Sequence, residues 1–215
     1  MSLEENSEIS EKDGNYVLTE DATLDLDFRE DLSKTLDGNG YTIDVTGDRS
    51  VLFYTVTGAI KNATIVADSI VAEENNGVIE NCTIQNVNRD YDSDETGGIC
   101  QENHGVIKNC TVNGTIEGDY TGLIAAENHG RIEDCTTDGY VFGESASGGI
   151  CGVQYEGIIK GCSSSAVVES IGSSGGICGE QKDFGETVIF EQCSFTGEIL
   201  ADCNNSGIIV GSDIS

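Results

Sequence analysis

The sequence contains no proline and no tryptophan, and aromatic residues make up only 6% of it. Of its 215 residues 28 are glycines, and so much glycine without proline indicates tight turns between short strands and not a disordered linker. No apolar run approaches the ~20 residues that a membrane-spanning helix needs. The opening "MSLEENSEIS" lacks the charged-then-apolar pattern of a signal segment, and "MSL" looks like a remnant of an expression tag. These absences favour one sizeable domain or one elongated array that does not insert into a membrane.

Basic residues are scarce: 10 lysines and arginines stand against 39 acidic residues, which gives a net charge of -29. This balance argues against a nucleic-acid partner, whose phosphates require a basic face. It also argues against docking on an anionic membrane surface. High acidity permits calcium binding, but more often it serves solubility alone.

Cysteine, in contrast, is abundant, with nine residues. In a secreted chain such a count usually indicates disulfides, and an odd number leaves at least one cysteine unpaired. The positions of the cysteines favour another role, because most of them fall within two recurring phrases.

The first phrase ends in a cysteine and two further residues, and its five cysteines are spaced by 28, 25, 27 and 31 residues. Its copies are "GVIENCTI" (77–84), "GVIKNCTV" (105–112), "GRIEDCTT" (130–137), "GIIKGCSS" (157–164) and "VIFEQCSF" (188–195). The second phrase alternates with it as "GGICQE" (97–102), "GLIAAE" (122–127), "GGICGV" (148–153), "GGICGE" (175–180) and "SGIIVG" (206–211). A period near 27 with short apolar stretches separated by Gly and Asn predicts a solenoid of short strands and not helices.

Stacking such repeats places equivalent positions about 4.8 Å apart, so that like residues form ladders in a shared core. A cysteine in an inward column is a small buried hydrophobe with a weak S–H donor. We align Ile99 with Leu123. We align the cysteines of the second phrase with Ile124 and Ile209. Because isoleucine can stand in place of cysteine there, this column requires apolar volume and not a thiolate. Redox or metal chemistry is the alternative for these thiols, and Cys203 lies outside both columns. The expected structural core is Cys82, Cys110, Cys135, Cys162, Cys193, Cys100, Cys151, Cys178, Ile99, Leu123, Ile150 and Ile177.

The residue before each cysteine of the first phrase marks an expected bend, because the apolar positions change parity there. Asn and Gly, which recur at this place, tolerate the left-handed backbone conformation of such bends. Stacked side-chain amides can also hydrogen-bond along the ladder. His104 and His129 occupy matching "ENHG" segments, and we expect them to stack on each other at a corner and not to form a metal site.

Residues 14–47 resemble the beginning of right-handed parallel β-helix proteins, with a first strand followed by the turn "LDGNGYTI". Together with the units at 97–118, 122–143 and 148–168, the chain resembles bacterial surface proteins that carry GLUG-type repeats. The resemblance covers roughly residues 37–211, although cysteine stands where the second phrase of that family more often has valine, and "NVNRDYDSDET" (86–96) is an insertion. It implies an all-β fold, a right-handed parallel β-helix (β-solenoid) of about seven coils with an N-terminal cap. The expected divisions are 1–13, a disordered acidic segment with tag residues; 14–36, the capping segment; and 37–215, the β-helix repeats.

Parallel β-helices also include polysaccharide-cleaving enzymes, which need paired carboxylates or calcium with a basic residue. The residue clusters typical of polygalacturonase-like enzymes do not occur in this sequence. Arg29, Arg49, Arg89 and Arg131 are scattered over different repeats. We therefore expect no catalytic residues, and keep a polysaccharide lyase or hydrolase, or an accessory carbohydrate-binding domain, as the alternative.

The insertion holds the sequence's candidate ligand sites. Asp90, Asp92 and Asp94 alternate as calcium-binding carboxylates do, although Glu95 stands where an EF-hand loop has glycine. A solvated acidic loop is the competing interpretation. Tyr91 and Tyr120 fall in corresponding inserts and are candidate contacts for a sugar, or ordinary loop tyrosines.

The sequence thus predicts a non-catalytic, extracellular, adhesin-like repeat module of the cell surface, with signal and anchor outside this sequence. A glycan or a host surface protein is the expected partner, or none if the module is a stalk. No nucleic acid, no membrane insertion by this segment and no cofactor other than calcium are expected, and the chain is expected to be a monomer.

Overall fold

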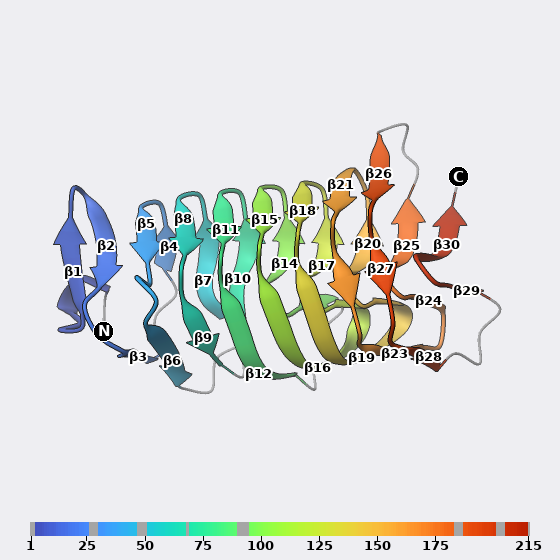
Figure 1. Cartoon of the computed structure of the whole chain (residues 1–215), viewed down its shortest axis with the longest axis horizontal. Helices are drawn as coiled ribbons and strands as arrows, with labels where there is room; N and C mark the ends of the chain where they lie inside the picture. The colour runs from blue at the N-terminus through green and yellow to red at the C-terminus, as the bar shows by residue number, and fades with distance from the viewer. Residues whose placement is uncertain are drawn as a thin grey trace.

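The computed structural model describes residues 3–25, 30–46, 51–67, 69–89, 95–182, 187–200 and 205–214. Within these ranges the chain is all-β: apart from one 3-10 turn, η1 (Leu3–Glu5), every regular element is a strand. The strands form three long sheets, named A, B and C below, which run side by side along an elongated molecule (Figure 1).

Sheet A has nine strands, all paired in parallel except the first two. In spatial order its strands are β1 (Ile9–Lys12), β2 (Asn15–Leu18), β5 (Thr35–Asp37), β8 (Ala59–Lys61), β11 (Val78–Glu80), β15 (Val106–Lys108), β18 (Arg131–Glu133), β21 (Gly157–Lys160) and β26 (Val188–Glu191). β1 and β2 form an antiparallel hairpin at the N-terminal end of the sheet.

Sheet C has eight strands and sheet B has thirteen, all paired in parallel. The strands of sheet C are β4 (Glu30–Leu32), β7 (Val51–Val56), β10 (Ile70–Asn75), β14 (Cys100–Asn103), β17 (Ala125–Asn128), β20 (Cys151–Gln154), β25 (Cys178–Lys182) and β30 (Val210–Ile214). Those on the main path of sheet B are β3 (Ala22–Asp25), β6 (Thr42–Thr46), β9 (Thr64–Val66), β12 (Thr83–Arg89), β16 (Thr111–Gly122), β19 (Thr136–Gly148), β22 (Ser163–Ser164) and β27 (Ser194–Phe195). Its remaining strands are β13 (Glu95–Gly97), β23 (Val167–Ser170), β24 (Ser173–Gly175), β28 (Glu198–Leu200) and β29 (Asn205–Gly207).

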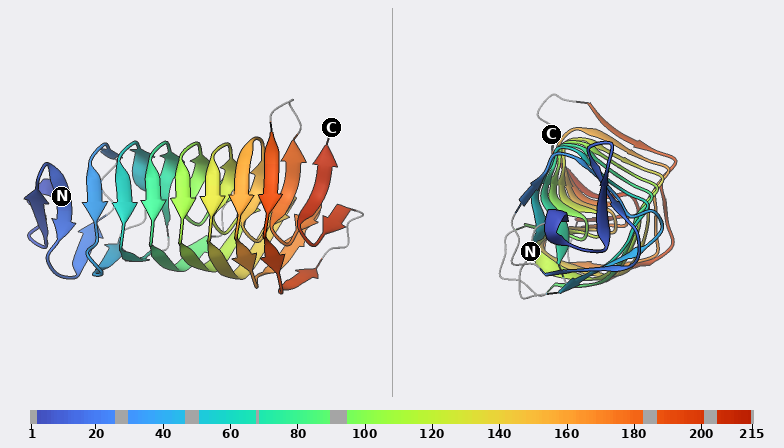
Figure 2. Two further views of the ribbon diagram at one scale, coloured as in Figure 1. Left: turned by 45° about the horizontal axis from the view of Figure 1, so that its top comes forward. Right: turned by 90° about the vertical axis from the view of Figure 1, so that its left-hand side faces the viewer.

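The chain visits the sheets in the order C, A, B and back to C, and one such passage is called a circuit below. Each strand pairs with its counterparts in the previous and the next circuit, as β11 does with β8 and β15. Figure 2 shows the circuits following one another from the N-terminal hairpin to the C-terminal strands. Equivalent positions of the repeat therefore lie next to each other in space.

The core lies between the sheets and consists of columns of like residues. In sheet A one column is completely buried, with Ile60, Ile79, Ile107, Ile132 and Ile159 all at 0% exposure. Burial of such a side chain contributes about 1.5–3 kcal/mol each. Because no circuit can cover its own apolar face, each depends on its neighbours for this contribution.

The register of the second phrase differs from the alignment given above. Ile99 lies beside Ile124, whose carbonyl accepts its N–H, and Leu123 lies beside Gly98. Cys100 pairs with Ala125 and not with an isoleucine. Leu123 is nevertheless buried at 0% exposure. The predicted alignment was wrong by one residue. Apolar residues stand at neighbouring positions in this phrase, so either register buries an apolar side chain, and only the backbone pairing shows which register is adopted.

Close backbone contact explains the glycine that follows the cysteine of the second phrase. A Cβ on Gly152 would lie 2.8 Å from the backbone nitrogen of Thr121, and one on Gly179 would lie 2.6 Å from that of Ser147. The ends of the long strands β16 and β19 therefore lie directly against the sheet C strands of the next circuit, β20 and β25, which leaves no room for a side chain.

The corner from sheet C to sheet A contains a buried row of amides that we did not predict. Asn75 donates to Asn103 at 2.7 Å, Asn103 to Asn128 at 2.6 Å, and Asn128 to Gln154 at 2.9 Å. All four side chains belong to residues with 0% exposure. Because each amide satisfies the next, the polar row does not carry the cost of unpaired buried groups.

The N-terminal divisions also differ from the prediction. Residues 1–13 were expected to be disordered, but η1 and β1 lie within them, and Leu3 is buried at 5% exposure. Asp13 and Gly14 have positive φ and make the turn to β2. The predicted cap, 14–36, already belongs to the stack, since β2, β3 and β4 pair in parallel with strands of the next circuit. The hairpin covers this end of sheet A because its apolar residues, Ile9 among them, pack against the core.

Candidate functional site

The bend between sheets A and B has the predicted left-handed backbone. The residues at this bend are Asn39, Asn62, Asn81, Asn109, Asp134, Gly161 and Gln192, with φ between 52° and 64°. Apart from Asn62, which is partly buried, the side chains at this bend are exposed, and three of them form a second amide row: Asn62 donates to Asp37 at 3.0 Å, Asn81 to Asn62 at 3.2 Å, and Asn109 to Asn81 at 3.2 Å. This row is called the amide row below.

A hydroxyl row runs parallel to the amide row, two residues further along each circuit, or three in the first circuit, from Asn39 to Thr42. Its members are Thr42, Thr64, Thr83, Thr111, Thr136, Ser163 and Ser194, paired in register from strand to strand. Each of these residues is partly or fully exposed. Hydroxyl and amide groups thus repeat together on one face, once per circuit.

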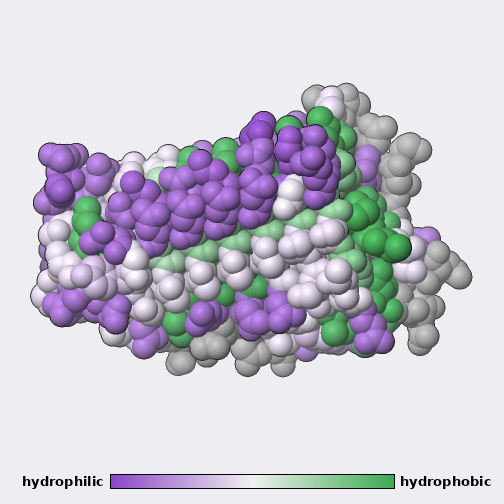
Figure 3. Space-filling model, viewed as in Figure 1, coloured by the Kyte–Doolittle hydropathy of each residue, from purple (hydrophilic) through white to green (hydrophobic). Residues whose placement is uncertain are grey.

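An open groove of about 300 Å³ lies at this bend near the N-terminal end of the stack. The residues that line it come from both rows and from the bend itself: Gly40, Asn62, Ala63, Thr64, Asn81 and Thr83. On this side of the molecule Figure 3 shows a hydrophilic band and, next to it, a paler band that both extend along the stack. The groove offers neutral donors and acceptors together with a comparable amount of apolar surface.

A row of charges along sheet A lies next to the amide row, and its signs alternate from strand to strand. Its members are Asp37, Lys61, Glu80, Lys108, Glu133, Lys160 and Glu191. Oppositely charged neighbours are close, with Lys61 3.3 Å from Asp37, Lys108 2.9 Å from Glu80, and Lys160 2.9 Å from Glu191. The row is called the charge row below, and it largely neutralises itself.

The predicted stacking of His104 on His129 is confirmed, and a third ring extends it. The two imidazoles have centroids 4.6 Å apart, and the Tyr155 ring stacks on His129 at the same distance. The stack lies at the corner from sheet C to sheet A, one ring per circuit. Because the rings cover each other's faces, mainly their edges are available to a ligand.

Carboxylates gather beside this stack. Glu127 accepts a hydrogen bond from the Tyr155 hydroxyl at 2.9 Å, and its other oxygen lies 3.6 Å from His129 Nε2. Burial disfavours the charge of Glu127, but these hydrogen bonds outweigh burial and hold its pKa below the usual value. Burial, together with the nearby charges of Glu127 and Glu102, raises the pKa of Glu95, although Glu95 accepts a hydrogen bond from the Gln101 amide at 3.1 Å. Two carboxyl groups from adjacent circuits therefore differ in their tendency to hold a proton, as acid–base pairs do.

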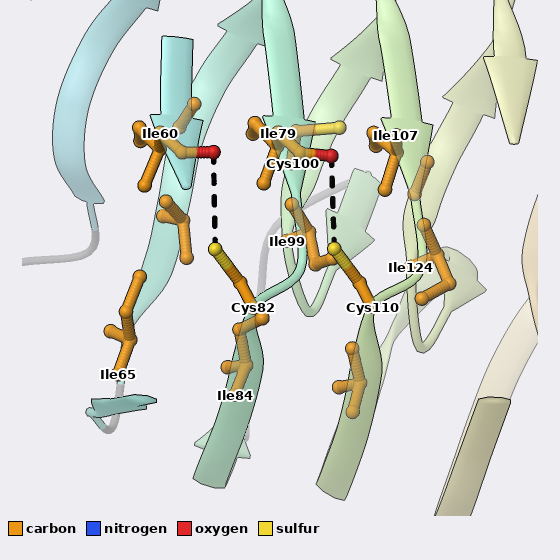
Figure 4. Close-up of a cluster of buried hydrophobic side chains, with 14 of the residues drawn as sticks. Ile60, Ile65, Ile79, Cys82, Ile84, Ile99, Cys100, Ile107, Cys110 and Ile124 are labelled. Atoms are coloured by element: carbon orange, nitrogen blue, oxygen red, sulfur yellow. Dashed lines mark hydrogen bonds between the residues drawn. The ribbon is translucent and has the colours of Figure 1, made fainter. Parts of the chain in front are cut away.

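The cysteines of both phrases belong to the hydrophobic core or pack against it. Cys82, Cys100, Cys110, Cys135, Cys151, Cys162 and Cys178 are buried and Cys193 is partly buried. Each sulfur of the first phrase lies near a carbonyl of the preceding circuit, as Figure 4 shows for Cys82 with Ile60 at 3.9 Å and Cys110 with Ile79 at 3.7 Å. Burial raises the pKa of the Cys100 thiol, which suppresses the reactive thiolate.

The other predicted ligand sites are only partly described. Asp90, Asp92, Asp94 and Tyr91 lie outside the described residues, as does Cys203. Tyr120 is described; it pairs in register with Glu95 and lies near enough to Tyr155 to affect the pKa of that phenol. The calcium and sugar-contact hypotheses for this insertion stay predictions.

Sequence reasoning missed Glu95 as a partner of Glu127, and it missed Tyr155, the hydroxyl row and the charge row. Two of these had a visible signal. The threonine or serine after each cysteine and the alternating Glu and Lys before each bend residue recur in the printed sequence. The contact between Glu95 and Glu127 had none, because it joins two parts of the repeat whose faces meet only in the folded chain.

Within the described ranges no group of three or more His, Cys, Asp or Glu side chains is arranged to hold a metal ion. No helix among the described residues is long and apolar enough to cross a membrane. No protein-family model matches the sequence, and no curated protein matches it. Among solved structures, the chain is similar to one described as a "putative immunoglobulin A1 protease" from Bacteroides ovatus, with a TM-score of 0.60 and 18% identity over 85% of this chain and 70% of that chain. At this identity the similarity concerns the fold alone.

Proposed function

We propose that this chain is a non-catalytic, adhesin-like module of the bacterial cell surface that binds a glycan or a host protein through a lateral face. We further propose that its three sheets form a right-handed parallel β-helix of about seven coils with an N-terminal cap. The parallel, in-register pairing of successive circuits and the similar fold from Bacteroides ovatus support this architecture.

The observation that carries the binding function is the groove between the amide row and the hydroxyl row. A stalk requires only a soluble surface, whereas these rows present neutral hydrogen-bonding groups in fixed positions on exposed strands. A rigid scaffold that positions such groups is typical of binding surfaces.

The resemblance to GLUG-type repeat proteins supports an extracellular location, because each unit of the repeat corresponds to one circuit of the chain. The net charge of -29 supports a partner other than nucleic acid or an anionic membrane. We also propose that the chain is a monomer and that it binds no cofactor other than calcium.

The test is binding of the purified chain to an array of glycans and host-matrix proteins, with and without calcium. Specific binding of a glycan or a host protein supports the proposed binding function. Loss of binding on chelation would indicate a role for Asp90, Asp92 and Asp94. If nothing binds under either condition, the binding function is wrong and the stalk remains.

A polysaccharide-cleaving enzyme is a second candidate, because the pKa of Glu95 is raised and that of its neighbour Glu127 is lowered, as in an acid–base pair. If this candidate holds, the chain shortens a polysaccharide, and Glu95→Gln or Glu127→Gln abolishes the cleavage, whereas the exposed Glu198→Gln does not. Release of reducing ends measures the reaction. Cleavage that is unaffected by either substitution would exclude this pair.

A further inference from the structure

The amide row and the hydroxyl row form one continuous strip along the stack. In each circuit the amide residue and the hydroxyl residue are separated by a single inward residue, as Asn81 and Thr83 are by Cys82. The strip begins at the groove and continues over the following circuits through Asn109 and Thr111. Its period is the spacing between paired strands, about 4.8 Å.

The hydroxyls of the strip are available to a ligand. Thr64, Thr83 and Thr111 have no side-chain hydrogen bond to any of the described residues; Thr64 and Thr83 are partly exposed and Thr111 is exposed. The amides are held in one orientation by their neighbours, since each donates one hydrogen to the residue of the preceding circuit. A primary amide has two N–H donors, so each retains one for a ligand.

We propose that this strip binds one linear, uncharged glycan lying along the axis of the stack, with successive sugar rings over successive circuits. The proposal rests on the binding function proposed above and names its ligand class and its site.

The spacing supports this ligand class. An extended glycan advances by about one ring length per residue, which is close to the ~4.8 Å between circuits, so one ring can lie over each circuit. Successive rings of a β-1,4-linked chain face opposite ways, so the same ring face returns at every second circuit. Sugar hydroxyls both donate and accept, which matches a strip made of Thr hydroxyls and Asn amides. A globular protein partner without internal repeats cannot make the same contact at each circuit.

The charges support an uncharged chain. The groove lining contains no ionisable side chain, and the charge row beside it pairs its own lysines with carboxylates. With a net charge of -29, the molecule repels an acidic polysaccharide and offers it no free row of cations.

The strip is best formed over the N-terminal circuits. Asn62, Asn81 and Asn109 are followed in the amide row by Asp134 and Gly161, which lack the amide donor. We therefore expect binding to strengthen with glycan length only until these N-terminal circuits are covered.

The test compares two triple variants of the whole chain by titration calorimetry. Thr64→Val, Thr83→Val and Thr111→Val together remove three hydroxyls of the strip while keeping their shape and strand propensity. Thr35→Val, Thr55→Val and Thr115→Val make the same change on other parts of the surface. Circular dichroism and Tm verify that both variants fold. The probes are β-1,4-linked oligomers of glucose, N-acetylglucosamine, mannose and xylose of increasing length, and oligogalacturonate as the charged probe.

We expect at least one uncharged oligomer to bind more tightly as it lengthens and then to level off. The strip variant should bind it about tenfold or more weakly, since neutral hydrogen bonds are lost at three positions, while the control variant binds as the wild type does. Equal binding by the strip and control variants would place the ligand elsewhere and overturn the strip, leaving the binding function intact. Preference for oligogalacturonate would overturn the uncharged ligand. If no uncharged oligomer binds the wild type, the strip proposal is wrong, and the array experiment decides separately whether a host protein is bound.

Discussion

At the scale of single residues, the bend between sheets A and B depends on side chains that tolerate a left-handed backbone. Asn109 has a φ of 52°, and Gly161 occupies the same place two circuits later with a φ of 64°. The bend turns the preceding residues toward sheet A and the following ones toward sheet B. Both the inward cysteines and the outward hydroxyls depend on this turn.

Replacement of Asn109 tests the bend. Asn109→Val places a β-branched residue in the left-handed region and should reduce the free energy of unfolding by about 1–2 kcal/mol or more. Asn109→Gly should cost less, because glycine adopts this conformation readily. Asn113→Val, at an exposed position of β16, the strand that follows the bend, is the matched control. Denaturant unfolding gives the free energy of unfolding of each variant. An equal effect of Val at positions 109 and 113 would contradict the backbone strain expected at the bend.

Thiol accessibility tests the inward cysteine columns. In the native protein at neutral pH the seven cysteines of the buried set should not react with a thiol reagent, because they are inaccessible and burial disfavours thiolates. All nine cysteines should react after unfolding. Fast reaction of several thiols from the buried set in the native state would contradict the columns.

The carboxyl pair predicts a pH dependence. The folded state raises the pKa of Glu95, so the stabilising contribution of this group is complete below its unfolded pKa and is lost as pH rises through the folded pKa. Glu95→Gln keeps a hydrogen-bonding side chain that does not ionise. Its stability relative to wild type should therefore increase between about pH 4 and pH 7, as measured by Tm.

The exposed Glu198→Gln is the control for that series. If Glu95→Gln and wild type show parallel pH profiles, the environment assigned to Glu95 is wrong. For Glu127, whose folded pKa is lowered, the opposite holds: its contribution is present above its unfolded pKa and is lost as pH falls through the folded value.

At the scale of strands, the charge row ties the register of sheet A to side-chain pairing. A one-residue shift of any strand would move its charged residue away from its partners. Neighbouring strands such as β11 and β15 also carry opposite charges at the same position, Glu80 and Lys108, and like charges there destabilise a sheet.

Reversal of one charge tests this row. Lys108→Glu places three acidic residues in succession on neighbouring strands and should lower Tm. Lys12→Glu makes the same charge change at an exposed position of β1 and controls for net charge. The difference in Tm between the two variants should shrink at high salt, because screening weakens exposed pairs. Equal Tm values of the two variants at low salt would show that the charge row does not contribute to stability.

The strands themselves were largely predictable, because each apolar phrase is short and is bounded by glycine or asparagine. The columns of the first phrase and the bend residues follow from that pattern. The register of Leu123 did not, since its neighbours Gly98 and Ile124 make a shift of one residue compatible with burial. The repeat in the sequence shows which positions are apolar, but only the backbone pairing shows which of these positions are adjacent in the fold.

At the scale of the whole molecule, the two ends of the stack differ. The β1–β2 hairpin covers sheet A at one end, whereas at the other end Ile189, Leu200 and Ile208 are exposed, and Figure 3 shows apolar surface there. Unpaired strand edges of this kind can associate. Binding experiments should therefore be repeated at several protein concentrations to separate self-association from ligand binding.

The candidate sites were less predictable than the fold. Each row can be seen in the sequence as a residue type that recurs at the same place in the repeat. The groove, however, exists only because two rows lie beside one bend. The Glu95–Glu127 contact likewise requires the end of sheet B to meet sheet C. Distances between columns come from the cross-section of the stack, which the repeat length alone does not determine.

The central claim is that equivalent residues stack in register, one per circuit, along a straight molecule. It is tested most directly by the distance between spin labels placed at Thr42 and Ser194 through non-canonical side chains, so that the native thiols stay untouched. These positions are the first and last of the hydroxyl row, and six strand spacings of about 4.8 Å separate them. The account predicts a narrow distribution centred near ~29 Å. A broad distribution, or a centre displaced by more than two strand spacings, would contradict it.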